Sequence, residues 1–275
     1  MFLKQKTMAE PNAVNRYVNS DANKSNVNGD NCVNLCIFPF MNYFRFMFIV
    51  ICGMIRCMQI AISIEPYLAV EKSKLTQYIE DIVKLSREFQ PGEVCLHFDY
   101  FKSNPEVFRL VQSYANQIDI DLHLMREPAP SITGFRSVSF DLTDVYNNKK
   151  LLNLQNSQLM NNINCVDAGC RGLVLDLGCE IRGCEDLIRS ARYIIVMTVK
   201  CGKSGQTFHS EALQLIPQVR ELNPNATMII DGGVNENNID LLKKDGVNVV
   251  VVGNYAKKCY ENNNFSIGIN RLLHK

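Results

Sequence analysis

The sequence predicts an α/β fold: a (β/α)8 TIM barrel over residues 58–275, preceded by a leader that is not a barrel element. Short apolar, β-branched runs alternate with amphipathic segments, which is the pattern of repeated strand–helix units. The runs Tyr193–Val199 and Val247–Val252 are hydrophobic almost throughout, as expected for parallel strands covered on both faces. The eight predicted strands are Met58–Ile64, Glu93–Asp99, Ile118–Leu124, Arg136–Asp141, Gly172–Leu177, Tyr193–Val199, Thr227–Asp231 and Val247–Gly253.

The segments between the predicted strands carry helix signals. Asn235 is expected to cap a helix that contains Ile239 and Leu242, and Gly246 is expected to end it in the left-handed conformation. An open, doubly wound sheet is disfavoured because no Gly-x-Gly-x-x-Gly turn follows the first strand. Another helical stripe consists of Leu75, Tyr78, Ile79, Ile82, Val83 and Leu85.

The composition is that of a globular protein with balanced charge. The 275 residues are 47% hydrophobic and 21% charged, and 29 Lys and Arg against 28 Asp and Glu give a net charge of +1. This balance gives no electrostatic footprint for a nucleic acid, so no nucleic-acid partner is expected. The 11 cysteines are odd in number and form no Cys-x-x-Cys pair, which indicates buried thiols in a reducing compartment and hence a cytoplasmic location.

Residues 1–57 differ from the rest of the chain. The stretch up to about residue 34 is rich in Asn, Ser, Lys and Asp, which predicts disorder. Residues 36–55 are strongly apolar but include Pro39, Asn42 and Arg45. Three interpretations stay open: sequence upstream of a true start at Met58, a membrane or targeting segment, or an ordered extension. A membrane partner is expected only if 36–55 is a real anchor.

Unusual polar residues stand at the ends of three predicted strands, where TIM barrels carry their functional groups. His97 and Asp99 end the second strand, His123 ends the third and Asp231 ends the seventh. Residues i and i+2 share one side of a strand, so His97 and Asp99 both point into the barrel mouth. Two imidazoles and two carboxylates suit one divalent ion, which predicts a metal site.

Small residues in three loops on adjacent strands predict an independent site for a phosphate. Glycine lets backbone N–H groups converge on an anion, and the loops after strands seven and eight are the usual phosphate site of such barrels. The residues are Gly202, Lys203, Ser204 and Gly205 after strand six, Gly232 and Gly233 after strand seven, and Gly253 and Asn254 after strand eight.

These motifs resemble, in collinear order from Met58 to the C-terminus, those of the ribulose-phosphate 3-epimerase family. The most specific part is 197–208 with 231–235. The resemblance implies interconversion of D-ribulose 5-phosphate and D-xylulose 5-phosphate in the pentose phosphate pathway, by proton transfer at C3 through an enediolate stabilised by a metal. It implies that Asp99 and Asp231 are the catalytic acid–base pair, that His97, Asp99, His123 and Asp231 hold the metal, and that Ser63, Met125 and Met197 contact the sugar along with the histidines and the phosphate loops.

The sequence also departs from the family pattern. The loop after Asp99 is shortened, and the phosphate loop loses a glycine but gains the cation Lys203. An epimerase for a related ketose phosphate, such as allulose 6-phosphate, and a catalytically weak sugar-phosphate-binding member therefore remain alternatives. The ligand set suits zinc, iron(II), manganese and cobalt alike. The expected partner is a small phosphorylated ketose, and the chain is expected to form a homo-oligomer.

Overall fold

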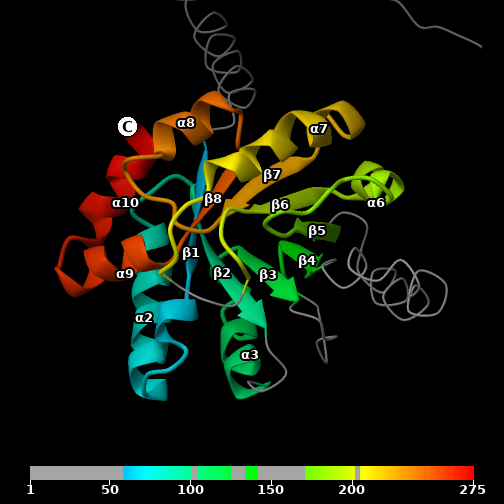
Figure 1. The fold of residues 1–275 in the computed structure, drawn as a ribbon. Helices are drawn as coiled ribbons and strands as arrows, with labels where there is room; N and C mark the ends of the chain where they lie inside the picture. Colours follow the sequence, from blue (N-terminus) through cyan, green and yellow to red (C-terminus); the bar gives the residue numbers. More distant parts are fainter. Residues whose placement is uncertain (1–57, 101–104, 125–133, 142–170, 202–204) are drawn as a thin grey trace, which may run out of the picture. The chain divides into compact units, whose positions relative to one another are not determined.

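The computed structural model describes residues 58–100, 105–124, 134–141, 171–201 and 205–275. Within these ranges, eight parallel strands close into a barrel in sequence order (Figure 1). The strands are β1 (Gln59–Ser63), β2 (Val94–Tyr100), β3 (Ile120–Leu124), β4 (Ser137–Asp141), β5 (Arg171–Leu175), β6 (Tyr193–Met197), β7 (Thr227–Asp231) and β8 (Val249–Val252). The predicted TIM barrel is confirmed, and the eight predicted strands differ from these only at their ends.

In the described ranges, helices follow β1, β2 and β5 to β8 and cover the outside of the barrel (Figure 1). No helix in the described ranges is long and apolar enough to span a membrane, whereas the apolar stretch 36–55 lies outside those ranges, so its role stays a prediction. The described helices are η1 (Glu65–Tyr67), α2 (Lys72–Ser86), α3 (Pro105–Gln112), α6 (Glu185–Ser190), η3 (Ser210–Gln214), α7 (Leu215–Leu222), α8 (Ile239–Lys244), α9 (Asn254–Glu261) and α10 (Phe265–His274).

The helix signals are confirmed with one correction. All six residues of the predicted stripe on α2 are buried, and Gly246 has a φ of 71°. Asn235, however, does not cap α8: the N-cap residue is Asn238. The Oδ1 atom of Asn235 instead accepts the N–H of Asn237 at 2.8 Å. This local turn occupies the side chain of Asn235 and delays the start of the helix.

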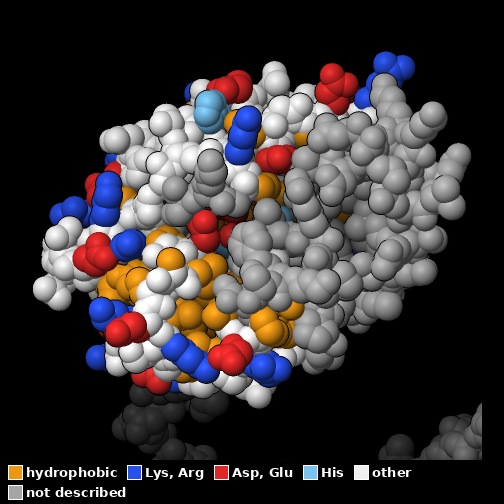
Figure 2. Space-filling view, turned by 60° about the horizontal axis from the view of Figure 1, so that its bottom comes forward, with side chains coloured by type: hydrophobic (Ala, Val, Ile, Leu, Met, Phe, Trp, Pro, Cys, Tyr) orange, Lys and Arg blue, Asp and Glu red, His pale blue; other side chains and the backbone are white. Residues whose placement is uncertain are grey.

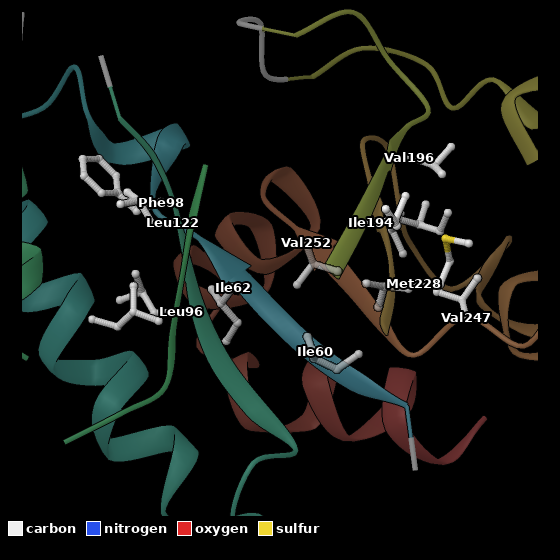
Figure 3. Close-up of a cluster of buried hydrophobic side chains, with 14 of the residues drawn as sticks. Ile60, Ile62, Leu96, Phe98, Leu122, Ile194, Val196, Met228, Val247 and Val252 are labelled. Atoms are coloured by element: carbon white, nitrogen blue, oxygen red, sulfur yellow. The ribbon is translucent and has the colours of Figure 1, made fainter. Parts of the chain in front are cut away.

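The strand residues divide between two sides of the barrel wall. Alternate residues point outward and pack beneath the helices, among them Ile62, Leu96 and Val252 (Figure 3). The intervening residues point into the barrel, where Ile195, Ile229 and other apolar side chains form a second cluster. Each strand is thus covered on both faces, which explains the nearly continuous hydrophobicity of β6 and β8.

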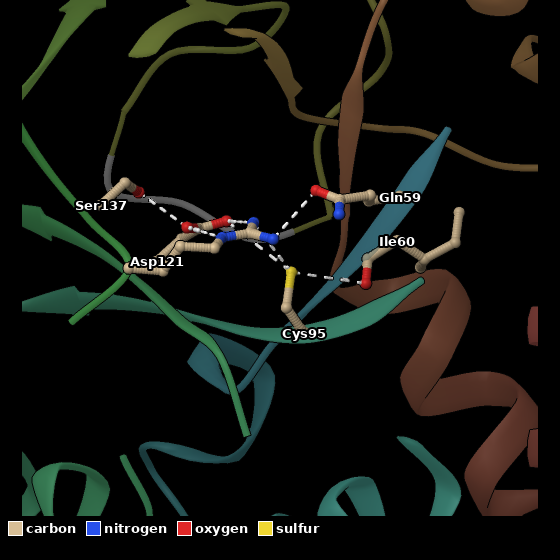
Figure 4. A network of polar contacts seen from close by, with 6 residues as sticks. Gln59, Ile60, Cys95, Asp121 and Ser137 are labelled. Atoms are coloured by element: carbon tan, nitrogen blue, oxygen red, sulfur yellow. Dashed lines mark hydrogen bonds and ion pairs between the residues drawn. The ribbon is translucent and has the colours of Figure 1, made fainter. Parts of the chain in front are cut away.

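A buried ion pair closes the interior at the end where the strands begin. Arg136, next to the start of β4, donates from Nε to Oδ1 of Asp121 at 2.9 Å and from Nη2 to Oδ2 of the same carboxylate. Its Nη1 donates to Oε1 of Gln59 at 2.9 Å, and its Nη2 lies 3.2 Å from Sγ of Cys95. Figure 4 shows these side chains, with Ser137, converging from β1 to β4. This network lies at the end where the strands begin, opposite the mouth formed by their carboxyl ends.

The cysteines only partly match the sequence prediction. Of the five in the described residues, Cys95 and Cys184 are buried, whereas Cys179, Cys201 and Cys259 are partly exposed, and no disulfide joins any of them. The prediction that they are buried is therefore wrong for three of the five, because these three lie in loops and a helix outside the barrel wall.

On the face shown in Figure 2, acidic and basic side chains are interspersed, as the balanced net charge suggests.

Candidate active site

Four side chains from three strands meet at the carboxyl end of the barrel. In β2 the period of two points His97 and Asp99 to the same side, and the β2–β3 register places Asp99 opposite His123. Asp231 ends β7. Each of the four offers one ligand atom, and these atoms all lie within 4.8 Å of one another. The predicted metal ligands are thus brought together by the strand register.

The distances within this four-residue cluster fit one small divalent ion. Nε2 of His97 lies 3.3 Å from Oδ1 of Asp99 and 3.5 Å from Oδ2 of Asp231, and Nδ1 of His123 lies 2.8 Å from Oδ1 of Asp99. In a tetrahedral site with ligands about 2.1 Å from the ion, neighbouring ligand atoms lie about 3.4 Å apart. The cluster therefore needs only small shifts to hold such an ion.

The hydrogen bonding of the two histidines also fits a metal. Both rings are buried, yet Nδ1 of His97 and both ring nitrogens of His123 have no hydrogen-bond partner among the described residues. The contact of His123 with Asp99 has the distance of an ion pair without the angles of a hydrogen bond. Buried polar atoms are normally paired, so Nδ1 of His123, which faces Asp99 without a hydrogen bond, is suited to bind an ion. In His97 the nitrogen that faces the cluster is Nε2, 3.3 Å from Oδ1 of Asp99.

Burial and neighbouring charges shift the pKa of each of three cluster residues, His97, Asp99 and Asp231, in opposite directions. Burial disfavours a charged His97, but the carboxylates, Asp99 above all, raise the pKa of His97 to about 9. Burial would raise the pKa of Asp99, but the charge of His97 more than offsets it and holds that pKa well below its usual range. Burial raises the pKa of Asp231, against the opposing charge of His97. The pKa values of the two aspartates are therefore shifted in opposite directions.

A cavity of about 580 Å³ opens above this cluster. Asp99 and Asp231 line it, whereas the two histidines lie beneath them and are not part of its described wall. The cavity is also lined by Ser63, whose Oγ accepts the N–H of Glu65 at 3.2 Å. Other predicted site residues in its wall are Met197, Gly205, Gly232, Gly233, Gly253 and Asn254.

Two glycines after β7 bring the backbone close to the cavity. Gly232 has a φ of 120°, and a Cβ there would lie 2.5 Å from a methyl group of Val199. Gly233 has a φ of 62°, and a Cβ there would lie 2.9 Å from the backbone nitrogen of Phe208. Only glycine fits both the conformation and the space, so these two residues let the chain turn tightly beside the cavity.

Some predicted residues lie outside the described ranges, and some lining residues were not predicted. Met125, Gly202, Lys203 and Ser204 belong to the first group, so their roles stay predictions. In the second group, periodicity could have indicated Val251, which lies two residues before Gly253 in the strand direction. The lining residues that sequence reasoning missed are Glu65, Val199, Lys200, Gln206, Val234, Asn235, Glu236, Asn237, Val251, Tyr255 and Lys258.

Solved structures similar to this chain support the fold alone. A tryptophan synthase from M. tuberculosis aligns with a TM-score of 0.54 at 9% identity, over 81% of this chain and 94% of that chain. A mutant tryptophan synthase alpha-subunit from Pyrococcus furiosus aligns with a TM-score of 0.53 at 12% identity, over 80% and 98%. At such identities only the barrel architecture carries over.

The sequence comparisons are more specific than the structural ones, because they point to one family. A ribulose-phosphate 3-epimerase of Aquifex aeolicus is 37% identical over 30% of this chain, and one of Helicobacter pylori is 30% identical over 52%. These matches span 39% and 66% of the two relatives. One of Bacillus subtilis is 24% identical over 68% of this chain and 87% of the relative. The model of the ribulose-phosphate 3-epimerase family matches residues 63–256, which include the whole four-residue cluster, and the chain belongs to this family.

Proposed function

We propose that this chain is a metal-dependent epimerase that interconverts D-ribulose 5-phosphate and D-xylulose 5-phosphate by inverting C3. The observation that supports it most is that Asp99 and Asp231 reach one cavity from β2 and β7, with His97 and His123 directly beneath. The named relatives point to the same reaction.

The chemistry requires two proton carriers. A carbon next to a ketone is inverted when its proton is removed on one face and another proton is returned on the opposite face. Asp99 and Asp231 line the cavity from β2 and β7, so one carboxylate accepts the first proton and the other, in its protonated form, returns one from the opposite side. In the reverse direction the two exchange roles.

A divalent ion held by His97, Asp99, His123 and Asp231 would stabilise the negative charge that develops on the substrate oxygens. The other cavity residues bind and orient the sugar. The hydroxyl of Ser63 accepts the N–H of Glu65, which leaves its own proton for a substrate oxygen. The apolar side chains of Met197, Val199 and Val251 line the same cavity and limit the access of water to the intermediate.

The phosphate of the substrate would lie at the far side of the cavity, against Gly205, Gly232, Gly233, Gly253 and Asn254. Backbone N–H groups at such glycines, and at the first turn of α9, are suited to an anion. Because this group is remote from C3, its binding energy positions the sugar without taking part in the proton transfers.

A metal-replacement assay tests the proposal. The purified chain is stripped of metal, supplied separately with zinc, iron(II), manganese or cobalt, and assayed with ribulose 5-phosphate and allulose 6-phosphate side by side. Activity on ribulose 5-phosphate that is lost on stripping and restored by at least one metal is the expected result. Faster turnover of allulose 6-phosphate, or no turnover of either sugar despite bound metal, would contradict the proposal and favour one of the two alternatives.

A matched pair of histidine variants assigns the metal. His123→Ala should lower metal content and activity together, because one of four ligands is lost. His209→Ala is the control, since this ring is far from complete burial and, among the described residues, its side chain pairs with Glu211 alone, at 2.7 Å. Full metal occupancy and full rate in His123→Ala would remove His123 from the metal site.

A further inference from the structure

Two lysines in the cavity wall, Lys200 and Lys258, have no role in the site as described so far. We infer, on the basis of the proposed function, that the ammonium groups of Lys258 and Lys200 bind the phosphate of the substrate directly. Both residues line the same cavity as the glycine loops. The phosphate site would then be a charged clamp rather than a set of backbone N–H groups alone.

Lys258 reaches the cavity from α9. This helix begins at Asn254, directly after Gly253, and Lys258 lies four residues later, on the same face of the helix. Helical side chains lean toward the N-terminus, so the ammonium of Lys258 extends over the turn at Asn254. The neighbouring Lys257 points elsewhere: its Nζ lies 3.8 Å from Oε1 of Glu261 and 5.5 Å from the ring centre of Tyr67.

Lys200 reaches the cavity from the loop after β6. Its carbonyl accepts a hydrogen bond from Nε2 of Gln206 at 2.6 Å, which ties the backbone of Lys200 to the far side of the loop. That loop contacts the start of α9, because a Cβ on Gly205 would lie 2.7 Å from Nδ2 of Asn254. The two lysines therefore reach the cavity from two segments that meet at Gly205 and Asn254.

The carboxylates described in the cavity wall do not pair with Lys200 or Lys258, so both ammonium groups can bind an anion. Four carboxylates line the cavity, and two of them, Asp99 and Asp231, belong to the metal cluster. Glu65 lies beside Ser63, and Glu236 accepts a hydrogen bond from Tyr255 at 2.8 Å and pairs with Arg271 at 3.6 Å. Among the described residues, neither Lys200 nor Lys258 has an ion pair or hydrogen bond through its ammonium. A phosphate dianion supplies the missing negative charge at this end.

A cationic clamp has kinetic consequences that backbone N–H groups do not have. Its attraction for the dianion is screened by salt, because both lysines stand at the solvent-exposed rim of the cavity. The clamp is also distant from C3, so it contributes equally to the ground state and the transition state. Uniform binding of this kind lowers KM and leaves kcat unchanged.

Steady-state kinetics of single variants test the inference. Lys258→Gln and Lys200→Gln should each raise KM for ribulose 5-phosphate by about 10- to 100-fold, the loss expected for one charge-assisted contact, with kcat nearly unchanged. Their KM values should also depend less on salt than that of the unmodified chain. Lys258→Arg should restore most of the affinity, and Lys257→Gln, the matched control on another face of α9, should behave as the unmodified chain.

Binding of inorganic phosphate, measured by titration calorimetry on the full chain, separates this inference from the proposed function. If the chain has no epimerase activity but binds inorganic phosphate less tightly in both glutamine variants, the proposed function fails and the clamp stands. If KM and phosphate affinity are unchanged in both variants, or if kcat falls at constant KM, the clamp is wrong whatever the chain catalyses.

Discussion

The buried hydroxyl of Thr198 donates a hydrogen bond of 2.6 Å to the carbonyl oxygen of Gly232. This contact joins the residue after β6 to the residue after Asp231, and the backbone N–H of Thr198 donates to the carbonyl of Asp231 at 2.8 Å. Thr198 thus fixes the end of β7 without facing the cavity itself.

Thr198→Val keeps the shape of the side chain but leaves the Gly232 carbonyl without its donor. We expect a loss of about 1 to 2 kcal/mol in the free energy of unfolding, and a fall in kcat of about tenfold, since a displaced Asp231 transfers protons poorly. Urea unfolding and steady-state kinetics measure the two effects. Thr76→Val is the control, because it removes an exposed hydroxyl that donates to the Lys72 carbonyl within α2. A fully active Thr198→Val would show that β7 holds its end without this bond.

The ion pair at the closed end of the barrel gives a second prediction. Asp121→Asn leaves the guanidinium of Arg136 buried without its counter-charge, and breaking such a pair costs about 3 to 5 kcal/mol of folding free energy. Asp186→Asn, which breaks the exposed pair with Arg189, should have no measurable effect. Denaturant midpoints of the two variants compare them directly. Equal midpoints would show that the buried pair adds nothing beyond a surface pair.

The third prediction concerns pH. In the metal-free protein the pKa of His97 rises from 6.5 to about 9 on folding, so its contribution to stability is fully present below pH 6.5 and is lost as the pH rises through 9. The pKa of Asp99 is lowered, so the contribution of the same pair is also lost below its unfolded value of 3.8. The loss on the alkaline side is at most about 3 kcal/mol.

Urea unfolding of the metal-free chain at pH 6 and pH 9.5 measures this loss, and His97→Gln should remove the difference between the two. Metal affinity should change in the opposite sense and rise with pH up to about 9, because the ion must displace the proton of His97. A metal affinity that is independent of pH between 6 and 9 would contradict the assignment of His97 as a ligand.

Isotope exchange separates the roles of the two aspartates. Asp99→Asn and Asp231→Asn keep a ligand oxygen but cannot carry a proton, so epimerisation should fall by about 10² to 10⁴-fold. Each variant should still exchange the C3 proton of one epimer with deuterated solvent, and the two variants should differ in which epimer exchanges. Deuterium incorporation into ribulose 5-phosphate and xylulose 5-phosphate is measured separately. Epimerisation at the normal rate in either variant would exclude that aspartate from the mechanism.

The barrel was predictable from the sequence because its signals are local. Continuous apolar runs such as β6 and β8 indicate strands buried on both faces. Polar residues near the ends of such strands, such as His97 and Asp231, are easily recognised because they interrupt this pattern. Since all strands of a parallel barrel end at one mouth, the strand pattern alone places residues together that are far apart in the chain. Their roles in catalysis and metal binding stay predictions.

The contacts that the sequence does not predict join residues far apart in the chain, and no local pattern encodes them. Arg136 stood in the sequence as the first residue of a predicted strand, and nothing near it showed that it pairs with Asp121 across β3 and β4. The predicted N-cap of α8 at Asn235 is wrong because Asn238, three residues later, is also an asparagine, and the local pattern does not distinguish the two. The sequence does not predict Lys258 as a cavity residue, because a lysine on an amphipathic helix is usually solvated. It lies in the cavity wall only because α9 meets the loop after β6 there.

The interior of the barrel has two electrically different halves. The inward side chains of β1 to β4 include Gln59, Ser63, His97, Asp121, His123 and Ser139, whereas those of β6 to β8 include Ile195, Met197, Ile229, Val249 and Val251, with Asp231 as the acidic exception. The polar side chains at the mouth therefore lie mainly on the side of β1 to β4, and Asp231 faces them from β7 across the barrel.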